Sequence, residues 1–209
     1  MVELPCPRPA PPEFRVPEPF REIISREKEQ RRRVLRARRA AINPATRQVH
    51  GEHLRHRCHE LPELAGARRV FLYVSFGSEM PTRSLMESLL ERGVELAVPV
   101  IEDGGVMKPA RLTDPRELRP GRFGIPAPRH PRPCRGPIDV ILAPCVAVTP
   151  EGRRLGAGGG YYDRFLAERA DTFVAALAFE AQVVDTLPTE PHDRAVDAVV
   201  TEQRVIRCR

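Results

Sequence analysis

The sequence has no tryptophan, and aromatic residues make up only 5% of its 209 positions. No apolar run approaches the roughly 18 residues that a membrane-spanning helix needs. The first residues also lack the charged-then-apolar build of a signal peptide. These absences exclude a transmembrane protein and argue against a secreted one, so we expect a soluble protein of the cytoplasm.

Cysteine is scarce and poorly placed for a structural or redox role. The five cysteines form no CxxC pair, and their number is odd. Without a secretory pattern they are expected to be reduced thiols. The chain also offers no convincing Ser-His-Asp or Cys-His arrangement. The sequence therefore argues against a disulfide framework and against a protein nucleophile.

Lysine is nearly absent from a basic chain. Of the 34 basic residues only Lys28 and Lys108 are lysines, and the net charge is +6. Such a surplus fits polyanionic ligands such as nucleotides, and it also fits nucleic acid. The most basic stretch begins near Arg21, and no aromatic residue occurs between Arg21 and Arg69. A stacking platform for bases is therefore missing, which argues against RNA as the ligand.

The first third of the chain predicts a tail and two helices. Residues 1–20 contain seven prolines and are expected to form a disordered or extended tail, followed by one domain over 21–209. A thin apolar stripe predicts a helix over 21–42. Asn43 and Pro44 then suit the N-cap and first position of a second helix that ends near Leu61. Its four histidines at spacings of three could hold zinc, but a solvated polar face is the favoured interpretation.

Strand and helix patterns alternate through the rest of the chain. A near-continuous apolar run over 69–76 predicts a strand buried on both faces, and 82–91 and 95–100 continue it as helix and strand. A short strand and a proline-rich loop to 137 come next. The remaining patterns predict strands and one helix at 138–143, 161–170, 172–179, 197–201 and 204–208. This order predicts a single three-layer α/β domain with a mostly parallel central sheet flanked by helices.

The most distinctive stretch runs from Thr149 to Arg164 and places four glycines among five residues between a strand and a helix. Glycines expose backbone N–H groups to a close ligand, and Arg153 and Arg154 add charge, so the stretch predicts a phosphate cradle. Tyr161 and Tyr162 offer flat faces for a heteroaromatic ring, and Asp163 offers a hard oxygen ligand for Mg²⁺. The pattern is neither a Walker A loop nor a dinucleotide fingerprint. A plain tight turn is the alternative interpretation.

Residues 154–164, Arg-Leu-Gly-Ala-Gly-Gly-Gly-Tyr-Tyr-Asp-Arg, resemble the signature of the 5-formyltetrahydrofolate cyclo-ligase family. Shorter segments agree in order, and the similarity spans roughly 22–205. These segments are Leu35-Arg36, Ser78-Glu79-Met80-Pro81-Thr82, Phe123-Gly124-Ile125-Pro126, Leu187-Pro188 and His192-Asp193. The resemblance implies ATP- and magnesium-dependent closure of 5-formyltetrahydrofolate to 5,10-methenyltetrahydrofolate, with release of ADP and phosphate.

The resemblance also implies a set of site residues. Catalysis is expected from Glu79, Arg154 and Tyr161, and magnesium ligation from Asp163 and Asp193. The ATP contacts implied are Arg32, Arg36, Arg154, Leu155, Gly156, Ala157, Gly158, Gly159, Gly160, Tyr161 and Tyr162. The folate contacts implied are Arg36, Val74, Glu79, Gly158, Gly159, Gly160 and Tyr161. ATP is a co-substrate, Mg²⁺ the cofactor, and a monomer without nucleic-acid or membrane partners is expected.

Two positions depart from the family pattern. Arg32 stands where the family has a lysine, which keeps the charge but replaces a point charge with a planar fork. Ala127 stands where the family continues with glutamate, so the loop loses an acid. Two alternatives remain at this stage: a non-catalytic or RNA-associated relative on the same scaffold, and an ATP-dependent ligase for another pterin-like acid.

Overall fold

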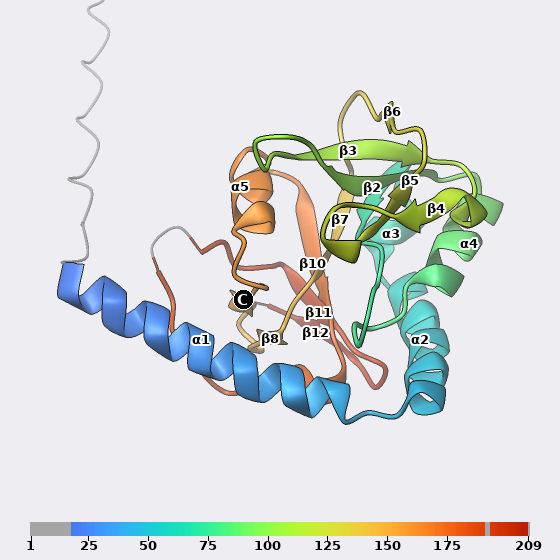
Figure 1. Ribbon diagram of the computed structural model, residues 1–209. Helices are drawn as coiled ribbons and strands as arrows, with labels where there is room; N and C mark the ends of the chain where they lie inside the picture. Colours follow the sequence, from blue (N-terminus) through green and yellow to red (C-terminus); the bar gives the residue numbers. More distant parts are fainter. Residues whose placement is uncertain (1–17, 191–192, 209) are drawn as a thin grey trace, which may run out of the picture.

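The computed structural model describes residues 18–190 and 193–208 (Figure 1). Most of the predicted tail over 1–20 lies outside the described residues, and so does His192. The helices of the described part are α1 (Glu18–Ala40), α2 (Pro44–His59), α3 (Pro62–Ala65), α4 (Arg83–Glu91) and α5 (Tyr161–Ala167), with short 3₁₀ turns at Pro115–Glu117, Arg122–Gly124 and Glu180–Gln182. Asn43 caps α2 as predicted, because its side chain accepts a hydrogen bond from the Thr46 N–H.

An eight-stranded sheet in the order β12-β11-β10-β7-β1-β2-β3-β6 forms the centre of the molecule. The five central strands pair in parallel, and β12, β3 and β6 add antiparallel edges. Two small two-stranded sheets, β4-β5 and β8-β9, lie outside it. The strands are β1 (Arg69–Leu72), β2 (Glu95–Ile101), β3 (Met107–Leu112), β4 (Leu118–Pro120), β5 (Pro126–Pro128), β6 (Arg132–Pro133), β7 (Val140–Pro144), β8 (Ala147–Val148), β9 (Arg154–Leu155), β10 (Phe173–Leu177), β11 (Ala198–Val200) and β12 (Val205–Arg207).

The sheet has a core on each face, which confirms the predicted three-layer architecture. Val70 and Leu72 of β1 pack with α2 and α4 on one face, whereas Phe71 between them packs with α5 on the other. The alternation follows from the period of two along a strand. Phe71 and Phe165 of α5 stack with ring centroids 4.4 Å apart. The central strands are therefore apolar on both faces, as the continuous run predicted, although β1 ends at Leu72 and not at residue 76.

Helix α1 runs along one edge of the sheet instead of covering a face (Figure 1). Leu35 is its buried apolar anchor and packs with Leu155 and Leu187 in a small separate core. Lys28 is also buried, and its ammonium group pairs with the carboxylates of Glu190 at 2.7 Å and Asp193 at 2.6 Å. These contacts join the first helix to segments at least 120 residues further along the chain.

The segment between β3 and β7 differs from the prediction of a proline-rich loop. It contains β4, β5 and β6, although prolines occupy several of the strand positions. Proline lacks an N–H and is tolerated on edge or very short strands, which is where these residues lie. The prediction of a proline-rich loop was wrong at these positions because a short or edge strand does not require an apolar run.

Gly152 has the least room for a side chain among the described glycines. Its φ is +86°, and a Cβ there would lie 2.3 Å from the Val196 carbonyl oxygen. We expect Gly152→Ala to cost about 3 kcal/mol from backbone strain and overpacking, which lowers Tm by roughly 6–12 °C. Thermal unfolding followed by circular dichroism measures this. Gly66→Ala is the control, since nothing lies within 4 Å of its Cβ position; equal Tm losses in both variants would contradict the expectation.

Candidate functional site

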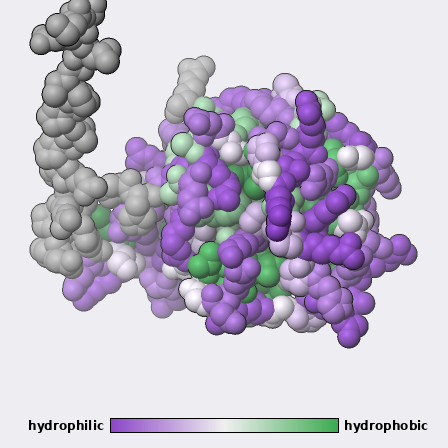
Figure 2. Space-filling model, turned by 90° about the horizontal axis from the view of Figure 1, so that it is seen from above, coloured by the Kyte–Doolittle hydropathy of each residue, from purple (hydrophilic) through white to green (hydrophobic). Residues whose placement is uncertain are grey.

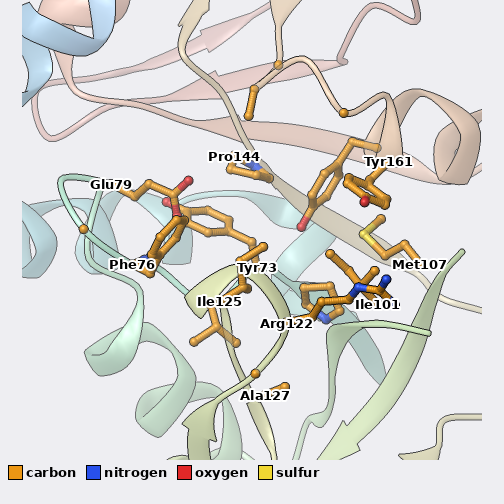
Figure 3. A pocket seen from close by; sticks show the side chains of 18 of the residues that line it. Tyr73, Phe76, Glu79, Ile101, Met107, Arg122, Ile125, Ala127, Pro144 and Tyr161 are labelled. Carbon is orange, nitrogen blue, oxygen red and sulfur yellow. The ribbon is translucent and has the colours of Figure 1, made fainter. Parts of the chain in front are cut away.

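A cavity of about 610 Å³ opens at the carboxyl ends of β1, β7 and β2. Figure 3 shows Tyr73, Phe76 and Glu79 together on one side of it and Tyr161 and Met107 on another. Parallel strands end at the same edge of a sheet, so the loops that follow them meet there. The sequence argument placed Glu79 at this edge, and the structure has it there.

The glycine stretch forms one wall and contacts the first helix. The Arg32 Nε donates to the Gly156 carbonyl oxygen at 3.0 Å, and an Arg36 guanidinium nitrogen donates to the Ala157 carbonyl oxygen at 2.7 Å. Arg39, one turn further along α1, donates to the Ser78 hydroxyl at 3.1 Å. Three arginines on one helix face thus hold the glycine stretch and the loop after β1, and Arg36 and Arg39 line the cavity.

The glycines are required by backbone conformation and by close packing. Gly158 and Gly160 have φ of +101° and +64°, in the left-handed region that L side chains rarely adopt. A Cβ on Gly159 would lie 2.6 Å from the ring of Tyr161. The stretch therefore presents bare backbone to the cavity, which is what a phosphate cradle needs.

Arg154 is the buried centre of the site, with a side chain only 1% exposed. It donates to Asp163 Oδ1 at 2.5 Å and to the Pro144 carbonyl oxygen at 3.3 Å, and it lies over the Tyr162 ring. Its Nε and the Tyr162 hydroxyl are buried and have no hydrogen-bond partner among the described residues. Unpaired buried donors of this kind call for a polar ligand, and a planar fork fits phosphate and carboxylate oxygens.

The loop after β1 is fixed by hydrogen bonds within the Ser78–Thr82 motif and its neighbours. The Tyr73 hydroxyl donates to the Met80 carbonyl oxygen at 2.8 Å. Thr82 is fully buried, and it and Ser75 each accept the other's backbone N–H at 3.1 Å. These hydrogen bonds fix the path of the loop, which places Glu79 in the cavity wall.

Burial raises the pKa of Glu79 above its ordinary value, although the Phe76 N–H and Arg39 act in the opposite direction. The native state then keeps this proton to a higher pH than the unfolded chain does. The contribution of Glu79 to stability therefore falls as the pH rises from the ordinary carboxyl range through the raised pKa.

We expect Glu79→Gln to have a Tm at pH 7 equal to or above that of the unsubstituted protein, with the difference vanishing near pH 4. Its turnover should fall about 10- to 100-fold, since a charge-assisted contact is lost. Glu91→Gln, on the exposed end of α4, is the control and should change neither quantity. A lower Tm for Glu79→Gln at pH 7 would show that the carboxylate stabilises the fold.

Asp163 is the carboxylate of the cavity wall that is best placed to hold a magnesium ion. Asp163 lines the cavity, and its side chain is 24% exposed beside the glycine stretch. Asp193 does not line this cavity and is held by Lys28. The described residues contain no cluster of three or more His, Cys, Asp or Glu side chains suited to a metal. Asp163 thus fits a Mg²⁺ that takes its other ligands from phosphates and water, whereas Asp193 as a ligand stays a prediction.

Most of the site residues expected from the sequence meet in this one cavity. Those that line it are Arg36, Val74, Glu79, Arg154, Gly156, Ala157, Gly159, Gly160, Tyr161, Tyr162 and Asp163. Arg32, Leu155, Gly158 and Asp193 do not line it. Arg32 contacts the cavity wall through its hydrogen bond to the Gly156 carbonyl oxygen. The side chain of Leu155 packs in the small core with Leu35 of α1. The histidines of α2 form no metal cluster within the described part of the chain.

Sequence reasoning missed several lining residues. Arg39 lies three positions after Arg36 on the same helix face, and that spacing could have indicated it. Tyr73, Phe76, Met107 and Arg122 come from three different segments. Only the fold brings them together, so no local pattern could have found them.

No helix among the described residues is long and apolar enough to cross a bilayer.

The fold and the site define an α/β protein with a glycine-rich loop lining a cavity at the carboxyl edge of a mostly parallel sheet. A sequence profile of the 5-formyltetrahydrofolate cyclo-ligase family matches residues 24–202. The 5-formyltetrahydrofolate cyclo-ligase of Mycolicibacterium smegmatis is 36% identical over an alignment of 189 residues, and the alignment covers 87% of this chain and 96% of the relative. The Escherichia coli K12 protein of the same name is 32% identical over an alignment of 180 residues, which covers 82% of this chain and 98% of the relative.

The solved structures agree with the sequence comparison. The Aquifex aeolicus 5,10-methenyltetrahydrofolate synthetase has a TM-score of 0.77 and 32% identity, covering 87% of this chain and 93% of its own. The Mycoplasma pneumoniae 5,10-methenyltetrahydrofolate synthetase shares the fold, with a TM-score of 0.66 at 18% identity. The chain belongs to the 5-formyltetrahydrofolate cyclo-ligase family, and it is an enzyme of the ligase class.

Proposed function

We propose that this protein closes 5-formyltetrahydrofolate to 5,10-methenyltetrahydrofolate at the expense of ATP, with Mg²⁺ as cofactor. The observation that carries the proposal is that the glycine stretch, Arg154 and Glu79 face one cavity. That cavity combines a phosphate cradle with an apolar chamber, as a reaction between a nucleotide and a pterin requires.

The ATP side is assigned to the glycine stretch. Its bare backbone admits the triphosphate closely, and Arg36 and Arg154 supply positive charge at the cavity wall. Arg32 acts through the loop it holds, since its guanidinium is bonded to the Gly156 carbonyl oxygen. When bound, Mg²⁺ would neutralise phosphate charge, and Asp163 is the carboxylate best placed to hold it.

The folate side is assigned to the apolar chamber beyond Glu79. Val74, Ile101, Met107 and Ile125 line this part of the cavity, and flat rings bury well against such side chains. Glu79 supplies the one carboxyl group among them and can hold a hydrogen bond to the pterin. Ala127 lines the same part, so the polar contact that a glutamate would make there is absent in this chain.

The chemistry requires activation because an amide oxygen is a poor leaving group. In the proposed route the formyl oxygen attacks the γ-phosphorus, and the bond from that phosphorus to ADP breaks. N10 of the folate then attacks the formyl carbon, loses its proton, and the oxygen leaves with the phosphate. The protein contributes positioning and charge neutralisation, as in other phosphoryl transfers, and no side chain need act as a nucleophile.

An RNA-binding role for the basic helix has less support. Arg32, Arg36 and Arg39 turn onto the glycine stretch and the loop after β1 instead of facing solvent together. A phosphate-backbone footprint needs such side chains on a free surface. The monomeric state and cytoplasmic location expected from the sequence remain predictions.

An isotope experiment tests the proposed route. 5-Formyltetrahydrofolate labelled with ¹⁸O in the formyl group is incubated with the protein, ATP and Mg²⁺. Because the formyl oxygen leaves with the transferred phosphoryl group, the label should appear in the released phosphate. Turnover with label recovered in water and none in phosphate would contradict phosphorylation of that oxygen.

A further inference from the structure

Arg39 lies in the last turn of α1 and differs in its surroundings from an arginine on the open surface. The face of the molecule in Figure 2 is mostly hydrophilic, as expected where charged side chains are in contact with water. Arg39 is half-buried, whereas its neighbour Arg38 is exposed. Arg39 also lines the cavity of the candidate site. Its charge therefore acts inside the site.

Two loops that follow different strands meet at the Arg39 guanidinium group. Its Nε donates to the Ser78 hydroxyl at 3.1 Å in the loop after β1, and its Nη1 donates to the Cys145 carbonyl oxygen at 3.4 Å after β7. The same carbonyl oxygen also accepts a hydrogen bond from the Gln182 side chain at 2.8 Å. These contacts hold the guanidinium group beside the residue that precedes Glu79.

The titratable groups that face Glu79 from the neighbouring elements are neutral. They are the Tyr73 hydroxyl after β1, the Cys145 thiol after β7 and the Tyr162 hydroxyl of α5. Burial raises the pKa of all three, that of the Cys145 thiol to about 12. None of these groups offers a charge that would balance the carboxylate.

Arg39 supplies a cation next to this neutral wall. Arg154 lines the same cavity, but its charge is paired with Asp163. Burial raises the pKa of Glu79, and the backbone N–H of Phe76 and the charge of Arg39 act against it. An opposite charge close to a buried carboxyl group favours its ionised form.

We propose that Arg39 is a positioning residue that keeps the Glu79 carboxyl group ionised and its loop in place for the pterin of the substrate. The inference rests on the proposed function, since that function assigns Glu79 to the pterin. An ionised carboxyl group only accepts hydrogen bonds, and a reduced pterin ring offers N–H donors. Arg39 thus acts through Glu79 and needs no contact of its own with the substrate.

A double-mutant cycle tests whether Arg39 acts through Glu79. Arg39→Gln should raise the KM for 5-formyltetrahydrofolate about tenfold at pH 7, as expected for one weakened charge-assisted hydrogen bond, and leave the KM for ATP unchanged. In the Glu79→Gln background the same substitution should change the KM less than about twofold, because the two residues form one unit. Arg38→Gln removes an equal charge from the same turn of α1 and should leave both KM values unchanged.

The pH dependence separates the charge of Arg39 from its packing. Without this cation the pKa of Glu79 rises further, so the KM deficit of Arg39→Gln should shrink as the pH is raised from 7 to 9. Arg39→Lys keeps the cation and should keep the pH profile of the unsubstituted protein. A deficit that is the same at every pH, or the same in the Glu79→Gln background, would overturn the proposal.

The titration of Glu79 can also be followed without substrate, by ¹³C NMR of protein labelled in its glutamate carboxyl groups. Glu79→Gln identifies the signal by its loss. The midpoint should lie at higher pH in Arg39→Gln than in the unsubstituted protein and in Arg38→Gln, and equal midpoints would overturn the proposal. If no form of the protein turns over 5-formyltetrahydrofolate, the proposed function fails, and this titration still decides whether Arg39 keeps Glu79 ionised.

Discussion

Arg154→Lys should lower kcat/KM for ATP-dependent turnover by about 10²- to 10³-fold, the loss typical of removing one donor that stabilises developing charge. Lysine keeps the charge but has no planar fork, so it cannot reproduce the fixed geometry in which one guanidinium group donates both to Asp163 and to a phosphate oxygen. The buried guanidinium of Arg154 makes both kinds of contact possible, since its Nε has no partner among the described residues. Steady-state kinetics with varied ATP measures the effect.

The neighbouring arginine provides the matched control. Arg153 is exposed, whereas the Arg154 side chain is buried. Arg153→Lys should therefore keep kcat/KM within about twofold, as a substitution on a solvated surface does. Both variants should keep a cooperative thermal transition. Arg154→Lys with more than a tenth of the original activity would mean that the fork is not needed for catalysis.

Asp163→Asn should raise the Mg²⁺ concentration needed for half-maximal turnover about 10- to 100-fold. The amide keeps the shape of the side chain but removes the charge that a hard cation prefers. Disturbing groups that support a metal ion commonly costs this much in affinity. Titration of activity against Mg²⁺ at saturating ATP measures the shift, and equilibrium binding of Mn²⁺ to the nucleotide complex provides a readout independent of turnover.

Two further aspartate variants serve as controls for Asp163→Asn. Asp171→Asn removes an exposed carboxylate away from the cavity and should leave the Mg²⁺ titration unchanged. Asp193→Asn should have a smaller effect than Asp163→Asn, because Asp193 is held by Lys28 outside the cavity wall. An unchanged half-saturation in Asp163→Asn would remove this aspartate from the metal site.

The parts of the site that the sequence predicted are those within one continuous stretch. The glycine stretch, Arg154 and Asp163 lie within ten residues of each other, so local pattern and resemblance sufficed to identify them. The three-layer architecture with a mostly parallel sheet was also predictable, because the central strands are apolar on both faces. The predicted and observed helices differ by a few residues at their ends; α5, for example, ends at Ala167 instead of the predicted residue 170.

The parts that the sequence could not predict depend on contacts between distant segments. Lys28 and Asp193 are 165 positions apart, and nothing in either local pattern indicates that they pair. The pairing of β3 with β6 is likewise not indicated by either segment, since the proline-rich pattern of β6 predicted a loop. The pairing of these strands is decided by the fold around them, and that information is spread over the whole chain.

The central claim is tested most directly by incubating the protein with 5-formyltetrahydrofolate, ATP and Mg²⁺ while following the absorbance of the methenyl product and the release of ADP. The account predicts that both rise together in a ratio of one to one, and that neither rises when ATP is omitted. ADP release without methenyl absorbance, or with another pterin-like acid as the only productive substrate, would contradict it.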